Sequence, residues 1–170
     1  METSKADIVK KMHTQHAELI KRAINGAERV RNYSLAAAYR DCRMFDYGHT
    51  QTTDELAELL KQPQAIEVCL RFDFPDLQVF RELDVTDAPQ RYGIYIDRGA
   101  VEINNPQGVI FLIGETTAAI TCNELHIYHI ICMHGAKAIV NASGWAMVRV
   151  QEQHRQHKAI INVTDNAISL

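Results

Sequence analysis

Long apolar runs, proline and glycine are all scarce in this sequence. Its 170 residues include only four Pro and eight Gly, which excludes collagen-like and Pro/Gly-rich disordered chains. No stretch approaches the roughly 18 consecutive apolar residues of a membrane-spanning helix. No apolar segment near the N-terminus predicts a signal peptide either. We therefore expect a cytoplasmic protein with no membrane contact.

Signatures of catalysis and metal binding are also missing. The sequence has no P-loop and no Gly-x-Gly-x-x-Gly, Gly-x-Ser-x-Gly or paired-carboxylate motif. Its histidines include no His-Glu-x-x-His and its cysteines no Cys-x-x-Cys, the spacings typical of zinc sites. We expect no metal, no cofactor and no enzymatic activity. The cysteines are predicted to be reduced and buried: Cys42, Cys69, Cys122 and Cys132.

The densest group of metal-ligating side chains consists of His126, His129 and His134 with Cys122 and Cys132. On a strand, His126 and His129 would face opposite sides, because they are three residues apart. A Cys132–His134 nucleophile pair is disfavoured, because an inward Cys132 would keep its thiol protonated. We expect structural roles for all of these side chains.

Charge is distributed unevenly along the chain. Residues 1–50 carry nine basic and six acidic side chains, residues 51–90 three and nine, and residues 91–170 six of each. The basic surplus of the first segment is too small to follow a nucleic-acid backbone, so nucleic acid is not expected as a partner. The acidic middle segment is predicted to be a solvated helical surface.

The first half of the chain has helical periodicity. Thr52 and Glu55 have the spacing of a capping box at a helix start. Pro63 and Pro75 each precede apolar residues at helical spacing, and proline is tolerated in a first helical turn. Four or five short helices are predicted before residue 85. We assign residues 1–88 to a helical cap.

The second half has short β-branched and aromatic runs separated by Gly and Asn. Alike residues recur 18 positions apart, as in Asn105, Asn123 and Asn141. A parallel β-solenoid explains this recurrence, because equivalent residues of successive coils lie above one another. An antiparallel meander would explain the strands but not the constant spacing. The predicted fold is α+β, with an N-terminal bundle of short helices capping a parallel β-solenoid of 18-residue coils over residues 89–170.

Alternation within the strands predicts which side chains point inward. Ala118, Ile120 and Cys122 should lie inside, while Lys137 and Arg149 should lie outside. The first coil does not fit this register, and a slip of one residue there would repair it. The outward residues of the second strand in each coil then form an apolar surface: Val109, Phe111, Ile113, Ile127, His129, Ile131, Trp145 and Met147.

Such a surface is too large for a soluble monomer to leave bare. The N-terminal helices are one cover for it, and a second subunit or another partner is the alternative. Within it, Phe111, His129, Trp145 and Met147 are the predicted interaction surface.

A second hypothesis places a ligand in the helical half. Arginine and tyrosine on a helix that leads into a loop are able to hold an anion or a peptide, although such a cluster more often fixes the loop against its own domain. The predicted ligand cluster is Arg40, Asp41, Arg43, Tyr47 and His49.

The segment from Gly135 to Val150 resembles the Asn/Gly-Ala-x-Val coils of uncharacterised bacterial β-solenoid proteins. This resemblance implies a fold and no activity. It leaves two main hypotheses of function, and an enzyme of unrecognised type is the third. The first is a non-enzymatic interaction or scaffold protein, with a protein partner or self-association. The second is a small-molecule, glycan or peptide binder that uses the groove between helical cap and solenoid.

Overall fold

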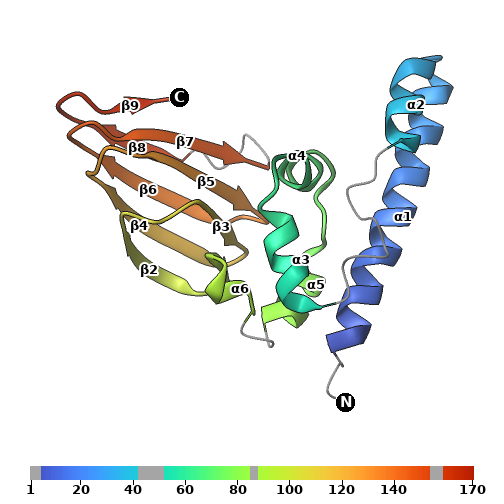
Figure 1. The fold of residues 1–170 in the computed structure, drawn as a ribbon, viewed down its shortest axis with the longest axis horizontal. Helices are drawn as coiled ribbons and strands as arrows, with labels where there is room; N and C mark the ends of the chain where they lie inside the picture. The colour runs from blue at the N-terminus through green and yellow to red at the C-terminus, as the bar shows by residue number, and fades with distance from the viewer. Residues whose placement is uncertain (1–4, 42–51, 85–87, 154–158) are drawn as a thin grey trace.

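The computed structural model describes residues 5–41, 52–84, 88–153 and 159–170. Within them the helices come first and the strands second (Figure 1). The helices are α1 (Lys5–Arg29), α2 (Tyr33–Arg40), α3 (Thr53–Leu60), α4 (Pro63–Phe72), α5 (Leu77–Asp84) and α6 (Ala88–Arg91). The strands are β1 (Ile94–Ile96), β2 (Gly99–Asn104), β3 (Val109–Ile113), β4 (Thr116–Cys122), β5 (Ile127–Met133), β6 (Lys137–Ala142), β7 (Met147–Glu152), β8 (Ile160–Val163) and β9 (Ile168–Ser169).

Local sequence signals account for the helix boundaries. The capping box is confirmed, since Thr52 Oγ1 accepts from the Glu55 N–H and Glu55 accepts from the Thr52 N–H. Pro63 occupies the first turn of α4, as predicted. Helix α5 begins at Leu77, where the Asp76 side chain accepts from the Val79 N–H. None of the described helices has both the length and the hydropathy that a bilayer-spanning segment needs.

The strands form a parallel β-solenoid, as the repeats indicated. A five-stranded sheet has the order β1-β3-β5-β7-β9, and a four-stranded sheet has the order β2-β4-β6-β8. All of the strand pairs are parallel. Consecutive strands therefore alternate between the two sheets, and each coil adds one strand to each.

The uniform 18-residue coil is wrong. Paired residues are 17 apart between β2 and β4, 20 apart between β4 and β6, and 21 apart between β6 and β8. Asn105 and Asn123 do stack at a corner, where Asn105 Nδ2 donates to Asn123 Oδ1 over 2.7 Å. Asn141 instead pairs with Thr121 and bonds to Asn162 in β8. The offset rises from 17 to 20 because seven residues separate Thr121 from His129, whereas four separate their partners Asn104 and Val109. One further residue is added between β7 and β8.

The interior of the solenoid agrees with the predicted alternation. Ala118, Ile120 and Cys122 are fully buried between the sheets. The slip in the first coil is also confirmed, because the 17-residue offset aligns Val101 with Ala118 and Ile103 with Ile120. The other inward residues include Ile110, Leu112, Tyr128, Ile130, Cys132, Ala136, Ala138, Val140, Ala146 and Val148.

The helical cap covers part of the outer face of the five-stranded sheet. In Figure 1 the helices lie on the side toward which the β5 and β7 arrows point, with α1 farthest from the solenoid. Phe111 and Ile113 of β3, with Ile131 and Met133 of β5, are buried in one core with side chains from α1, α3, α4 and α5. One apolar cluster therefore joins the cap to the solenoid.

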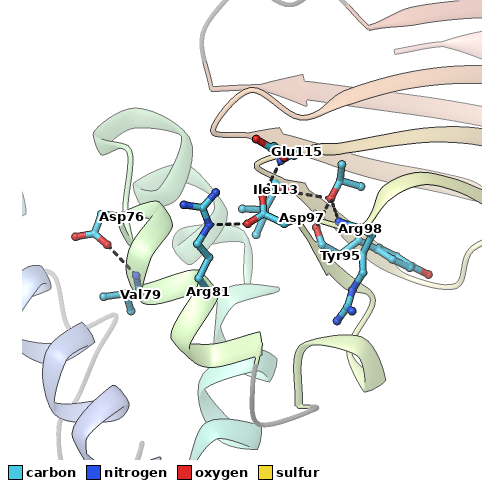
Figure 2. A network of polar contacts seen from close by, with 9 residues as sticks. Asp76, Val79, Arg81, Tyr95, Asp97, Arg98, Ile113 and Glu115 are labelled. Carbon is cyan, nitrogen blue, oxygen red and sulfur yellow. Dashed lines mark hydrogen bonds and ion pairs between the residues drawn. The ribbon is translucent and has the colours of Figure 1, made fainter. Parts of the chain in front are cut away.

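Polar contacts bind the same junction at the corner between β1 and β2. Arg81 reaches from α5 to Asp97, whose other carboxylate oxygen accepts from the Glu115 N–H over 2.7 Å (Figure 2). Arg98 forms an ion pair with Asp84 at 2.6 Å. The hydrogen bond from Arg81 is the main reason why the pKa of Asp97 lies below its usual range. The corner is thus tied both to α5 and to the next coil.

Candidate functional site

A groove lies between α4 and the outer face of the five-stranded sheet. Its volume is about 630 Å³, within the range of ligand-binding clefts. Helix α4 forms one wall, with Ile66 and Leu70 toward the groove. Val109 of β3 and His129 of β5 belong to the opposite wall. These two residues are paired across the strands, so the groove follows one column of outward side chains.

The polar lining of the groove is mainly basic. Lys61, Arg71 and Arg149 contribute three positive charges, and Glu67 contributes the single negative charge of the lining. Arg71 Nη1 lies 3.9 Å from Glu67 Oε1, at the outer limit of an ion pair. Lys61 and Arg149 have no ion-pair partner among the residues that the structure describes. The groove therefore has an excess of positive charge.

His129 and Gln151 form the floor between these cations. His129 Nε2 lies 2.7 Å from Gln151 Oε1, and this hydrogen bond orients the imidazole. Arg149 is paired with His129 on the neighbouring strand, so its guanidinium begins from the same outward column. His129 and Gln151 therefore place hydrogen-bond donors and acceptors next to the positively charged side chains of the groove.

An exposed apolar strip borders the groove. It consists of Leu125, Ile127, Trp145, Met147 and Ile168, of which Leu125 is 77% exposed, Trp145 64%, Ile127 54% and Ile168 47%. Ile127 pairs with Met147, and Met147 with Ile168, so three of the five form a continuous outward column. This column lies two residues from the column of His129 and Arg149 on the same strands.

The four residues of the predicted interaction surface separate into three environments. Phe111 is fully buried beneath the helical cap and contributes nothing to an exposed surface. His129 lines the groove. Met147 belongs to the apolar strip, and Trp145 lies in the corner before β7 rather than on the strand itself. Val109, Ile127 and Trp145 are 18 positions apart, and the expectation that they would stack in successive coils is wrong, because Val109 pairs with His129 and Ile127 with Met147.

The predicted ligand cluster is described only in part. Arg40 forms an ion pair with Glu28 of α1, and Asp41 ends α2 with its N–H donating to Ala37 O. Both contacts are internal to the α1–α2 hairpin. Arg43, Tyr47 and His49 lie outside the described residues.

Among the described residues, Cys122, Cys132, His126 and His134 pack against neighbouring side chains and backbone, whereas Cys42 lies outside the described residues. Burial raises the pKa of Cys132 to about 12, with a further contribution from the charge of Glu152, and it raises the pKa of Cys122 to about 11. These thiols stay protonated at neutral pH. His134 Nε2 hydrogen-bonds to Pro75 O at 2.9 Å, and His126 packs edge-on against Tyr128. Within the described ranges, no three metal-ligating side chains gather.

Sequence reasoning missed the cations of the groove. Arg149 was correctly placed outside, but its charge was not connected with Lys61 and Arg71, which lie about 80 residues earlier in the chain. Only the packing of α4 on the sheet brings the three cations to one groove.

No protein-family model, no curated protein and no solved structure matches this chain.

Proposed function

We propose that this chain is a non-enzymatic interaction protein that binds a protein partner through the apolar strip. The observation that carries the proposal is the exposure of Ile127 and Ile168 on either side of Met147 on a parallel sheet, with exposed Trp145 in the corner just before β7. Exposed contiguous apolar surface is typical of binding sites in soluble proteins. Tryptophan is also among the residues that contribute most to binding energy when an interface buries them.

The apolar strip stays exposed because the helical cap covers only part of the outer face of the five-stranded sheet. The outward positions that the cap covers are apolar in β3 and β5, as at Phe111 and Ile131, but the aligned position in β7 is Gln151. The column of His129 and Arg149 then separates the cap from the strip. The apolar side chains beyond that column contribute nothing to packing of the described cap, which supports a role in binding.

The single tryptophan allows a direct test. Photo-crosslinking from the Ile127 position in a cell extract should capture partners that Trp145→Ser loses, because the substitution removes the largest apolar side chain of the strip. Ile139→Ser is the matched control, since Ile139 is an exposed apolar residue on the four-stranded sheet. The purified partner should shift Trp145 fluorescence to shorter wavelength. Identical partners for the wild type and both variants would contradict the proposal.

Light scattering addresses self-association through the same surface. If the partner is a second copy, the apparent mass should rise with concentration in the wild type and in Ile139→Ser, but not in Trp145→Ser. A constant monomer mass would leave a different protein as the partner.

The groove supports a second candidate function, the binding of a small molecule, glycan or peptide. Its volume of about 630 Å³ is sufficient for such a ligand. A thermal-shift screen should then identify compounds that stabilise the wild type and not Arg149→Ser. A screen in which every stabilising compound acts equally on both proteins would exclude the groove as the site.

A further inference from the structure

We propose that the partner supplies an extended acidic segment, with a carboxylate in the groove and a neighbouring large apolar side chain on the apolar strip. This proposal rests on the proposed function and specifies the chemistry of the partner. It assigns one ligand to two surfaces that the fold places side by side.

Charge is the first argument. The groove collects Lys61, Arg71 and Arg149 around one carboxylate, that of Glu67, which lies 3.9 Å from Arg71. The Arg71 guanidinium also lies over the Tyr39 and Phe72 rings, at 5.7 and 5.6 Å from their centroids. Neither Lys61 nor Arg149 has an acidic partner within the described part of the chain. An acidic ligand would complement these charges.

Backbone geometry strengthens this assignment. The Lys61 ammonium lies beside Gly108. Its Nζ is 3.8 Å from the position that a Cβ on this glycine would occupy. Gly108 immediately precedes β3 and Val109, so the ammonium is held against the sheet side of the groove. Arg149 lies in the same outward column as Val109, on β7, two strands away from β3. Two cations that are 88 positions apart in the chain therefore both lie on the sheet side of the groove.

Spacing is the second argument. Arg149 is two residues from Met147 on β7, and His129 is two residues from Ile127 on β5. Two residues along a strand span about 7 Å and bring side chains to the same face. In an extended peptide, side chains two positions apart also lie about 7 Å apart and on the same face. A segment with an acidic residue two positions from a large apolar residue would therefore meet the groove and the strip together.

The groove also suits a peptide more than a compact anion. Its α4 wall includes Pro63, Ile66 and Leu70. These side chains span about two turns of helix, or roughly 10 Å. Apolar side chains from α4 face polar side chains from the sheet, and such a mixed lining matches a chain with alternating residue types. The adjoining apolar strip extends the surface in the strand direction.

Labelled peptides test the proposal by fluorescence anisotropy. The probe peptide places Glu and Leu in turn at every second position, with a small polar residue between them, so that each Leu lies two positions from a Glu. The comparison peptides replace either every Glu by Gln or every Leu by Ser. We expect the Glu–Leu probe to bind about ten-fold more tightly than either comparison peptide. Its affinity should fall as salt concentration rises, because the screening of exposed charges increases.

Protein variants separate the two contributions. The double variant Lys61→Ser, Arg149→Ser should weaken the Glu–Leu probe by about ten-fold and leave the Gln–Leu peptide unchanged. Lys137→Ser, which removes an exposed cation on the four-stranded sheet, is the matched control and should change neither. Circular dichroism establishes that each variant keeps its strands.

The outcomes distinguish this proposal from the proposed function. One outcome is that Ile127→Ser weakens the binding of every peptide while the double variant Lys61→Ser, Arg149→Ser changes none. The apolar strip would then bind partners, but the proposal that the partner supplies an acidic segment would be wrong. Equal binding of the Glu–Leu and Gln–Leu peptides to the wild type would also overturn the acidic class. If no peptide binds at millimolar concentration, both the segment proposed here and its use of the strip are wrong.

Discussion

Arg81 Nε donates to Asp97 Oδ2 over 2.6 Å, and this bond joins a helix of the cap to the first corner of the solenoid (Figure 2). Asp97 has φ +48°, a left-handed conformation that Asp adopts more readily than most residues. Its carboxylate also accepts from the Glu115 N–H one coil later. One side chain therefore links α5 to two successive coils of the solenoid.

Asp97→Ala should lower the free energy of unfolding by roughly 1–3 kcal/mol, because the substitution removes two charge-assisted hydrogen bonds. Urea denaturation measures the loss. Arg81→Ala should have a smaller effect, because it leaves the bond from Glu115 in place. An equal loss in both single variants and in the double variant would show that the backbone bond contributes nothing.

Gly114→Ala tests the close approach of two corners. Gly114 has φ +65°, and an added Cβ would lie 2.1 Å from Asp97 Oδ1. The matched control is Gly99→Ala, since Gly99 has φ +64° and nothing within 4 Å of its added Cβ. Gly99→Ala should lower the free energy of unfolding by only about 1–2 kcal/mol, the strain of an alanine in the left-handed conformation. Gly114→Ala should lower it measurably more in the same urea titration. Equal losses would exclude a steric role for Asp97.

Asn105→Ala should destabilise the solenoid more than Asn141→Ala. Asn105 Oδ1 accepts from Asn123 N–H at 2.9 Å and from the hydroxyl of buried Tyr128 at 3.0 Å. The Asn123 N–H is exposed, but the Tyr128 hydroxyl is part-buried, and leaving it without an acceptor costs roughly 1–3 kcal/mol. Asn141 contributes an exposed hydrogen bond to Asn162, whose loss should cost about 0.5 kcal/mol or less. Thermal unfolding of the two variants would reveal the difference, and equal melting temperatures would contradict it.

Acid should destabilise the cap through His16. Burial, with a smaller contribution from the charge of His13, lowers the pKa of His16 to about 4. Between pH 6.5 and pH 4 the unfolded chain takes up a proton that the folded chain does not, so stability falls as the pH falls through this range. The total loss is up to about 3 kcal/mol. The variant His16→Leu should show a flatter dependence of stability on pH, whereas an unchanged slope would assign the acid sensitivity to other groups.

Local patterns were sufficient for much of the fold. The capping box at Thr52 and the first-turn position of Pro63 were predicted because each depends on neighbours within a few residues. Strand alternation likewise predicted the inward positions of Ala118 and Ile120. The coil length was wrong because chance recurrences such as Asn123 and Asn141 have the same 18-residue spacing as the true stack of Asn105 on Asn123.

The sequence by itself determined that helices precede a parallel solenoid and which side chains of each strand point inward, since periodicity and alternation are properties of short segments. Only the tertiary structure decided how far the cap extends over the sheet. It placed Phe111 beneath the helices, left Trp145 exposed, and brought Lys61 to the same groove as Arg149. The physical reason is that corner lengths set the coil register, and the register with the docking of α4 sets which distant residues meet.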